Sequence, residues 1–435
     1  MKIKTQKKDI EEVLIIKQPA HKKPVRPQLF WRWLQKTLAK NDLKAASVAY
    51  HTVGMEKLDA KTPCLILMNH SCFLDLEIAS DFFYPRPLSI VCTSDGFVGK
   101  EGLMRAIGCI PTDKFVTEVS LVRDILYALH KIGTSVLLYP EASYSFDGCC
   151  TPLPDTLGRL IHRLNVPVVS VITHGAFLFD PLYNMLQKRK VPVSVEVSYL
   201  FSPEEAAALS PDEINARLKE LFSFDAFAEQ REKGLRVTEP FRADGLNRVL
   251  YKCPHCLKEG SMEGRGTTLT CHACGKRYEL TEEGSMQALD GETEYPHIPD
   301  WYRWERDCVR RELEEGSYSL EVDVDIRIMA DFRAIYEVGE GHLSHTAEGF
   351  RLVGCGGRLD VVQRPLFSYS LYSDYYWYEL GDMICISDMQ RLYYCFPKHH
   401  EDVVAKTRLA AEELFKLKRA EKEREKQENK IKERV

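Results

Sequence analysis

The chain has 435 residues, 44% of them hydrophobic, which is enough for roughly two or three domains with substantial cores. Its formal net charge of -5 argues against general nucleic-acid binding by the whole protein. We expect no transmembrane helix, because no apolar run approaches about 18 residues, and no signal peptide, because the start of the chain is rich in charge. The fourteen cysteines are typical of a reducing compartment, so the sequence predicts a cytoplasmic protein.

A basic N-terminal segment spans residues 1–50 and carries twelve Lys and Arg against four Asp and Glu. Within it, residues 27–40 predict an amphipathic helix with Phe30, Leu34 and Leu38 along one face. This helix is suited to the interface of an anionic membrane, which predicts a peripherally membrane-associated protein. The alternative is that the same face packs on the domain that follows.

Residues 51–225 predict an α/β domain with a mostly parallel sheet flanked by helices, because short apolar runs alternate with helical periodicity. The predicted strands span 63–69, 88–92, 135–139, 166–173 and 192–200, and the predicted helices 76–83, 118–132, 154–164 and 203–222.

His70 is the only histidine with an aspartate, Asp75, five positions downstream, and it directly follows the first of these strands. Open α/β sheets bind ligands where the carboxyl ends of their strands lead into loops. An imidazole can take a proton from an alcohol, and a carboxylate can orient the imidazole and stabilise its protonated form. The two residues are therefore a candidate catalytic pair. The alternative is that Asp75 caps the next helix and His70 belongs to the core.

Residues 248–282 contain four cysteines in the pattern C-x2-C-x14-C-x2-C, namely Cys253, Cys256, Cys271 and Cys274. Four thiolates complete the tetrahedral shell of Zn²⁺ and leave no open position, so we predict a zinc ribbon in which the metal is structural, with iron as the alternative. Because the flanking sequence is only modestly basic, we do not expect nucleic acid as a partner.

Residues 300–400 predict a β-rich accessory domain, since 318–328 alternates with a period of two and further aromatic-rich strands follow. We expect a small antiparallel barrel or sandwich, followed by a charged C-terminal helix within 401–435. A lipid- or protein-docking module and a purely structural unit are equally compatible with this part of the chain.

Three further segments of the α/β domain accompany His70 and Asp75. They read Gly108-Cys-Ile-Pro-Thr-Asp-Lys114, Leu137-Leu-Tyr-Pro-Glu-Ala-Ser-Tyr-Ser145 and Asn165-Val-Pro-Val-Val169. Their order and spacing over residues 50–222 resemble the glycerolipid acyltransferase family, typified by 1-acylglycerol-3-phosphate acyltransferases. The resemblance implies an O-acyltransferase that moves a fatty acyl group from an acyl thioester to the hydroxyl of a lysophospholipid or related lipid acceptor.

The resemblance also implies roles for individual residues. His70 would be the general base and Asp75 its orienting partner, and an already activated thioester needs no covalent enzyme intermediate. Acyl-CoA or an acyl carrier protein thioester would be the donor, which makes acyl carrier protein a candidate partner. The implied acceptor-binding residues are Gly108, Lys114, Pro140, Glu141 and Ser143; for Glu141 the alternative is a buried glutamate bonded to backbone, and for Lys114 an ordinary surface lysine.

Two positions depart from the family pattern. Lys114 and Tyr144 stand where the family usually has arginine, and lysine cannot make the bidentate bond of arginine to phosphate. This favours a less anionic acceptor than a phosphate monoester.

The alternative function is a non-catalytic lipid- or protein-binding scaffold on a degenerate acyltransferase fold. Cys72 suggests a thioesterase nucleophile, but a packed thiol is the favoured interpretation.

Overall fold

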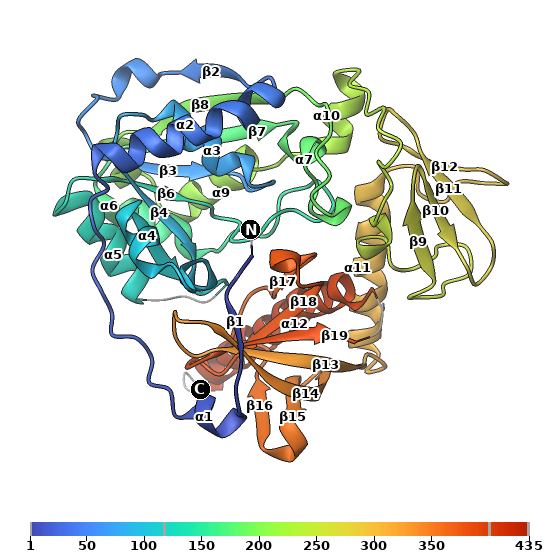
Figure 1. Cartoon of the computed structure of the whole chain (residues 1–435). Coiled ribbons are helices and arrows are strands. Elements are labelled where there is room, and N and C mark those ends of the chain that lie inside the picture. The colour runs from blue at the N-terminus through green and yellow to red at the C-terminus, as the bar shows by residue number, and fades with distance from the viewer. Residues whose placement is uncertain (1, 116–118, 399–401, 433–435) are drawn as a thin grey trace.

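A computed structural model of the chain describes residues 2–115, 119–398 and 402–432. Three β-sheets organise these residues: a seven-stranded sheet in the N-terminal half, a four-stranded sheet, and an eight-stranded sheet near the C-terminus (Figure 1). No helix within these ranges combines the length and apolar character needed to cross a membrane.

The seven-stranded sheet has the order β2-β8-β7-β3-β6-β4-β5. Every neighbouring pair is parallel except β7 with β8, which agrees with the predicted mostly parallel sheet. Its strands are β2 (Ala49–Val53), β3 (Leu65–Met68), β4 (Leu88–Thr93), β5 (Cys109–Thr112), β6 (Ser135–Leu138), β7 (Val168–His174) and β8 (Ser194–Phe201).

Helices cover both faces of this sheet. On β3, Ile66 and Met68 join the core that includes residues of α2 (Leu29–Ala45) and α3 (Leu74–Phe82). The alternate residues Leu65 and Leu67 join a second core, with residues of α5 (Val119–His130), α6 (Thr156–Leu164) and α9 (Pro211–Leu221). Because the sheet is covered twice, all of β3 is buried and reads as a continuous apolar run.

The sequence predicted five of the seven strands; β2 and β5 were not predicted. The helix predicted at 203–222 is two helices, α8 (Pro203–Ala208) and α9, because Ser210 caps a new helix that begins at Pro211. Residue 118 of one predicted helix, and residues 401 and 433–435 of the predicted C-terminal unit, lie outside the described ranges.

The four-stranded antiparallel sheet follows the predicted cysteine pattern. It consists of β9 (Met262–Arg265), β10 (Thr268–Cys271), β11 (Arg277–Leu280) and β12 (Met286–Ala288), and so extends beyond the predicted limit at residue 282. Helix α11 (Ile298–Glu314) comes next, and its buried Trp301 stacks edge-on against Tyr278 of β11.

The eight-stranded sheet has the order β16-β15-β14-β13-β19-β18-β17 with β1 added beside β14. The predicted β-rich, mainly antiparallel unit is confirmed. Its strand order runs from β16 to β17, and the sheet curls so that β16 lies beside β18, where the Ser387 N–H donates to Gln363 Oε1 at 2.8 Å. The long helix α12 (Val403–Lys432) packs beside α11, and buried residues of both helices belong to one hydrophobic core. The strands are β1 (Thr5–Lys7), β13 (Leu320–Met329), β14 (Ile335–Thr346), β15 (Gly349–Gly354), β16 (Leu359–Gln363), β17 (Tyr372–Asp374), β18 (Met383–Ser387) and β19 (Leu392–Pro397).

Short helices complete the described chain. They are α1 (Ile10–Leu14), α4 (Glu101–Ala106), α7 (Ala176–Phe179) and α10 (Ala226–Glu232), with 3-10 turns η1 (Met55–Lys57), η2 (Ser94–Phe97), η3 (Leu182–Asn184), η4 (Leu246–Arg248), η5 (Cys355–Gly357) and η6 (Trp377–Glu379).

Candidate functional site

His70 and Asp75 meet at the carboxyl edge of the seven-stranded sheet. His70 lies in the loop after β3, and Asp75 lies in the first turn of α3. The distance from His70 Nδ1 to Asp75 Oδ2 is 3.2 Å, and Asp75 is completely buried. The same carboxylate oxygen accepts hydrogen bonds from the backbone N–H groups of Ser71, at 2.6 Å, and Cys72, at 3.1 Å. Asp75 therefore orients the imidazole and also holds the loop that carries it.

Two neighbouring strands fix the backbone of this loop. Asn69 exchanges hydrogen bonds with Thr173 of β7, whose N–H donates to Asn69 Oδ1 at 2.8 Å. After β6, the buried Glu141 accepts from the backbone N–H of His70 at 3.0 Å and from that of Thr151 at 2.9 Å. Burial raises the pKa of Glu141 to about 7, and these two N–H groups oppose the shift. Glu141 is thus a backbone-bonded glutamate that supports the His70 loop, as the sequence-based alternative held.

The His70 ring lies against two tyrosines. Tyr139 stacks on it with centroids 4.0 Å apart, and Tyr144 lies 4.2 Å away at a tilt of 40°. The side chain keeps 18% exposure. Burial lowers the pKa of His70, while Asp75 acts in the opposite direction. Nδ1 faces Asp75, and no group among the described residues forms a hydrogen bond with Nε2. Tyr144 stands where the family that the chain resembles usually has arginine, and its ring packs on the imidazole.

Lys114 lies two residues beyond the end of β5, and its charge contributes to the lowered pKa of His70. Among the described residues no carboxylate forms an ion pair with it; Nζ instead faces the ring of Tyr372 in β17, 4.2 Å from the centroid. Burial lowers the pKa of Lys114. Ser143 accepts a hydrogen bond at 3.2 Å from Arg408 of α12.

Residues from the C-terminal sheet and α12 thus reach the candidate site, and sequence reasoning missed them. No local signal identified Tyr372 or Arg408, since they lie more than 200 positions from the nearest site residue. The aromatic density of the strands after residue 317 was the nearest available indication.

The structure does not bring Gly108 to this cluster. Gly108 precedes β5 and therefore lies at the opposite end of that strand from Lys114. Its φ is +95°, and an added Cβ would meet the carbonyl oxygen of Leu88 at 2.4 Å. Its requirement for glycine is thus one of backbone geometry. Pro140 is buried beside Glu141 and contributes to the turn after β6.

Two other residues with reactive side chains, Cys72 and His174, have separate surroundings. Cys72 is buried with Sγ 3.5 Å from the carbonyl oxygen of Ala176, and burial raises the pKa of its thiol well above the ordinary value. A thiol held protonated in this way is a poor nucleophile. His174, at the end of β7, is paired with Glu229 at 2.8 Å.

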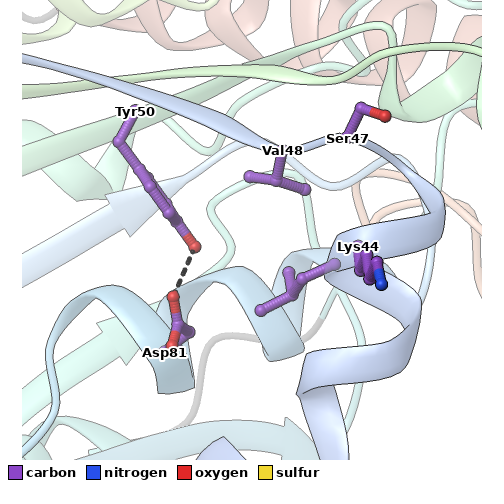
Figure 2. Close-up of a pocket in the computed structure, with 6 residues that line it drawn as sticks. Lys44, Ser47, Val48, Tyr50 and Asp81 are labelled. Atoms are coloured by element: carbon purple, nitrogen blue, oxygen red, sulfur yellow. Dashed lines mark hydrogen bonds between the residues drawn. The ribbon is translucent and has the colours of Figure 1, made fainter.

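An open depression of about 500 Å³ lies at the other end of α3 from Asp75 (Figure 2). Leu43, Lys44, Ser47 and Val48 line it together with Tyr50, whose hydroxyl donates to Asp81 at 3.1 Å. The depression contains neither residue of the candidate catalytic pair.

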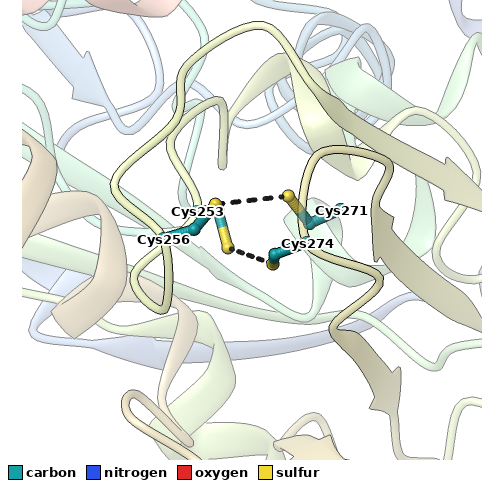
Figure 3. Close-up of side chains that lie close together, drawn as sticks. All are labelled: Cys253, Cys256, Cys271 and Cys274. Carbon is teal, nitrogen blue, oxygen red and sulfur yellow. Dashed lines mark hydrogen bonds between the residues drawn. The ribbon is translucent and has the colours of Figure 1, made fainter.

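The four predicted cysteines converge in the four-stranded unit (Figure 3). Their sulfur atoms all lie within 4.8 Å of one another, with Cys253 Sγ 3.8 Å from Cys274 Sγ and Cys256 Sγ 3.7 Å from Cys271 Sγ. Four sulfurs bound tetrahedrally at about 2.3 Å from a zinc ion would be about 3.8 Å apart. The cluster therefore has the dimensions of a four-thiolate metal site.

Comparison with known proteins assigns the α/β part of the chain. Residues 50–174, which contain His70, Asp75, Lys114 and Glu141, match the family model described as Acyltransferase. This segment belongs to the acyltransferase family. The acyltransferase domain is 24% identical over 147 residues to the human (Homo sapiens) 1-acyl-sn-glycerol-3-phosphate acyltransferase beta, an alignment that covers 33% of this chain and 52% of that protein. The chain thus spans about half the length of this curated relative.

One solved structure matches part of the chain at low sequence identity. It is the crystal structure of the 1-acyl-sn-glycerophosphate (LPA) acyltransferase PlsC from Thermotoga maritima, with 16% identity and a TM-score of 0.34, covering 44% of this chain and 76% of that one.

Proposed function

We propose that the protein is an O-acyltransferase that transfers a fatty acyl group from an acyl thioester to the hydroxyl of a lysophospholipid or related lipid acceptor. One observation carries the proposal: the 3.2 Å contact between His70 Nδ1 and Asp75 Oδ2 lies at the carboxyl edge of an acyltransferase-family domain and leaves Nε2 free of described partners. The relatives that match this domain are named for acyl transfer to glycerophosphate lipids.

In the proposed reaction, His70 Nε2 takes the proton from the acceptor hydroxyl as its oxygen attacks the thioester carbonyl carbon. The tetrahedral intermediate collapses, the C–S bond breaks, and the leaving thiolate takes the proton back from the imidazolium. Asp75 stabilises the imidazolium and holds the neutral ring in the tautomer that carries its proton on Nδ1. Acyl-CoA and acyl carrier protein thioesters both supply this donor chemistry, so acyl carrier protein remains a proposed partner.

Helix α2 is the proposed membrane-docking surface. It exposes Leu29, Phe30, Trp33 and Leu38, with exposed fractions between 50% and 69%. Its basic side chains Arg32 and Lys36 turn toward the protein, where Lys36 forms an ion pair with Asp81 at 3.1 Å. Apolar side chains that face solvent while charged neighbours face inward suit an acyl-chain interface. The exposed Lys40 and Lys44 at the end of α2 suit anionic headgroups. A peripheral membrane location follows.

The four-cysteine cluster is the proposed structural zinc site. All four sulfurs would bind the ion, so no position remains for substrate, and the metal would supply folding energy to the four-stranded sheet. Each pair of cysteines sits in a tight turn in which a later N–H donates to the first cysteine's carbonyl: Leu257 to Cys253 at 2.9 Å and Gly275 to Cys271 at 2.8 Å. Because both cysteine pairs share this turn, it supports a metal site and argues that the four cysteines do not lie close together by chance.

Replacing His70 by alanine is expected to lower kcat for acyl transfer by on the order of 10²–10⁴, because the proton of the acceptor hydroxyl then has no base. The assay supplies acyl-CoA or acyl carrier protein thioesters with a panel of lysolipids. His174→Ala is the matched control: it removes another strand-end histidine paired with a carboxylate and should leave kcat near the wild-type value. Wild-type activity in a folded H70A protein would refute the mechanism.

The pH dependence of kcat follows from the lowered pKa of His70. A general base acts when it is neutral, so activity rises as the pH passes upward through its pKa. Because burial lowers that pKa, the acid limb is expected below the ordinary histidine value of about 6.5. Measuring kcat between about pH 4.5 and 8 at saturating substrate checks the position of the limb. An acid limb centred above about pH 7 would contradict a buried, neutral imidazole as the base.

Binding to anionic vesicles is expected to depend on α2. The double substitution Phe30→Ser and Trp33→Ser should reduce co-sedimentation with phosphatidylglycerol-containing vesicles several-fold, because it removes two exposed aromatic side chains from the docking surface. A matched control is Val353→Ser with Val362→Ser, which removes exposed apolar side chains from β15 and β16. Equal losses in both double variants would contradict docking through α2.

Metal content is expected to depend on the cluster cysteines. Purified protein should contain about one zinc ion per chain, and Cys271→Ser should lose it and unfold at a lower temperature, since a bound structural ion stabilises only the folded state. Elemental analysis and thermal unfolding measure the two effects. Cys355→Ser, at a buried cysteine outside the cluster, is the control and should retain the metal. Retention of metal by C271S would overturn the assignment.

A further inference from the structure

Two tyrosine rings contact the His70 imidazole, and both come from the segment that follows β6. The ring of Tyr139 stacks on the imidazole with centroids 4.0 Å apart and an interplanar angle of 23°. The ring of Tyr144 lies 4.2 Å from it. The Asp75 carboxylate constrains the imidazole only at its Nδ1 edge, whereas rings in direct contact restrict rotation of its plane. The three contacts together fix the direction of Nε2.

The backbone of this segment explains how one strand end supplies both rings. Strand β6 lies parallel beside β3, so its next residue, Tyr139, comes level with the residues that lead to His70. The Ala142 N–H donates to the carbonyl of Tyr139 at 3.1 Å and closes a tight turn. Beyond the turn, the Ser145 N–H donates to the carbonyl of His70 at 3.2 Å, which holds Tyr144 beside the imidazole.

Both tyrosines are neutral rings in this environment. Burial raises the pKa of Tyr139 and of Tyr144 well above the ordinary value, and the charge of Asp75 acts in the same direction on both, as that of Asp374 does on Tyr144. The buried hydroxyl of Tyr139 has no hydrogen-bond partner among the described residues, so it relays no proton to them. The faces of neutral aromatic rings carry negative potential and attract a cation within about 6 Å of the centroid.

The charged and titratable groups around the imidazole act on it in opposite directions. Asp75 of α3 favours the protonated form of His70, whereas burial and the charge of Lys114 disfavour that form. Glu141 accepts from the backbone N–H of His70, and its pKa of about 7 leaves it partly protonated near neutral pH. The thiol of Cys72, in the same loop, stays protonated. A base that must accept a proton here therefore requires further stabilisation of its cationic form.

We propose that Tyr139 and Tyr144 are positioning residues of the reaction, whose rings hold Nε2 of His70 toward the acceptor hydroxyl and stabilise the imidazolium that forms when this hydroxyl loses its proton. The inference rests on the proposed function, in which His70 is the base. Tyr144 stands where the family usually has arginine. A guanidinium at this place would repel the imidazolium, whereas a tyrosine ring attracts it. The replacement therefore alters the surroundings of the base in this chain.

Titration of His70 by nuclear magnetic resonance tests the ring contacts without turnover. The full-length protein is labelled with carbon-13 at histidine Cε1, and His70→Ala identifies the His70 signal. Tyr139→Leu and Tyr144→Leu are each expected to lower the pKa of His70 by about 0.5 to 1, because a cation–π contact is lost. Tyr139→Phe and Tyr144→Phe keep the ring faces and should leave the pKa at the wild-type value. The matched control is Tyr50→Leu, which removes a partly buried tyrosine at the other end of α3 and should not change the pKa.

Kinetics with an acyl thioester and a lysolipid give a second readout. Each leucine variant is expected to lower kcat about three- to tenfold and to leave KM for the acceptor within about twofold, since the lost contact acts on the base. The acid limb of kcat should move to lower pH, because a base of lower pKa becomes neutral at lower pH. A loss of folded protein alone would reduce the amount of active enzyme without moving this limb.

An unchanged pKa of His70 in both leucine variants would overturn the proposal and leave the tyrosines as packing residues. An equal fall in the phenylalanine variants would also overturn it, because the hydroxyl groups would then matter and not the ring faces. If the leucine variants do not fold, Tyr144→pentafluorophenylalanine decides the question: it keeps the ring but removes the negative potential of its face, so the pKa must fall relative to Y144F. A lowered pKa in a protein that shows no acyl transfer would support the ring contacts and reject only the proposed function.

Discussion

The buried carboxylate of Asp75 is the group on which the arrangement around His70 depends. Its Oδ2 faces His70 Nδ1 and accepts hydrogen bonds from the backbone N–H groups of two loop residues. Thr173 Oγ1 lies 3.5 Å from the other carboxylate oxygen, Oδ1. A buried carboxylate requires such donors, and removing them would leave an uncompensated charge. The loop, the first turn of α3 and the end of β7 are therefore held in one mutual position. This pre-organisation suits a base that must meet its substrate in a defined geometry.

Packing of the C-terminal sheet on the acyltransferase domain gives the candidate site its surroundings. Val98 and Phe115 from the domain share a core with Tyr372, Trp377 and other aromatic side chains of the C-terminal strands. The C-terminal strands therefore pack against the segments that follow β4 and β5. Charges enclosed in this way interact more strongly than they would in water, which increases the influence of Lys114 on the pKa of His70. The C-terminal part is thus more than an appendage in the proposed site.

The four-cysteine unit is joined by ion pairs to helices α11 and α12. Lys406 of α12 forms ion pairs with Glu259 of the cysteine-containing unit, at 2.7 Å, and with Glu312 of α11, at 3.3 Å. Lys252, next to the metal-type knuckle, binds the same two carboxylates at 3.1 and 3.4 Å. This partly buried network joins the cysteine unit to the start of the helix that carries Arg408. A proposed structural metal would therefore help to fix the position of α12.

Local features of the sequence were sufficient to predict the layered α/β domain, the pairing of His70 with Asp75 and the four-cysteine cluster. Each depends on local information: a buried apolar run such as Leu65–Met68, a short spacing across one loop, or two tight knuckles. The sequence did not reveal strand β2, whose mostly exposed residues give no periodic signal, or the strand order of the C-terminal sheet, because alternation within a strand does not specify which strands pair. Only the tertiary structure decided that Glu141 supports the His70 loop, that Gly108 lies at the far end of β5, and that Arg408 reaches Ser143. Those contacts join segments separated by many residues, so their geometry is set by the packing of whole elements and not by the sequence around each residue.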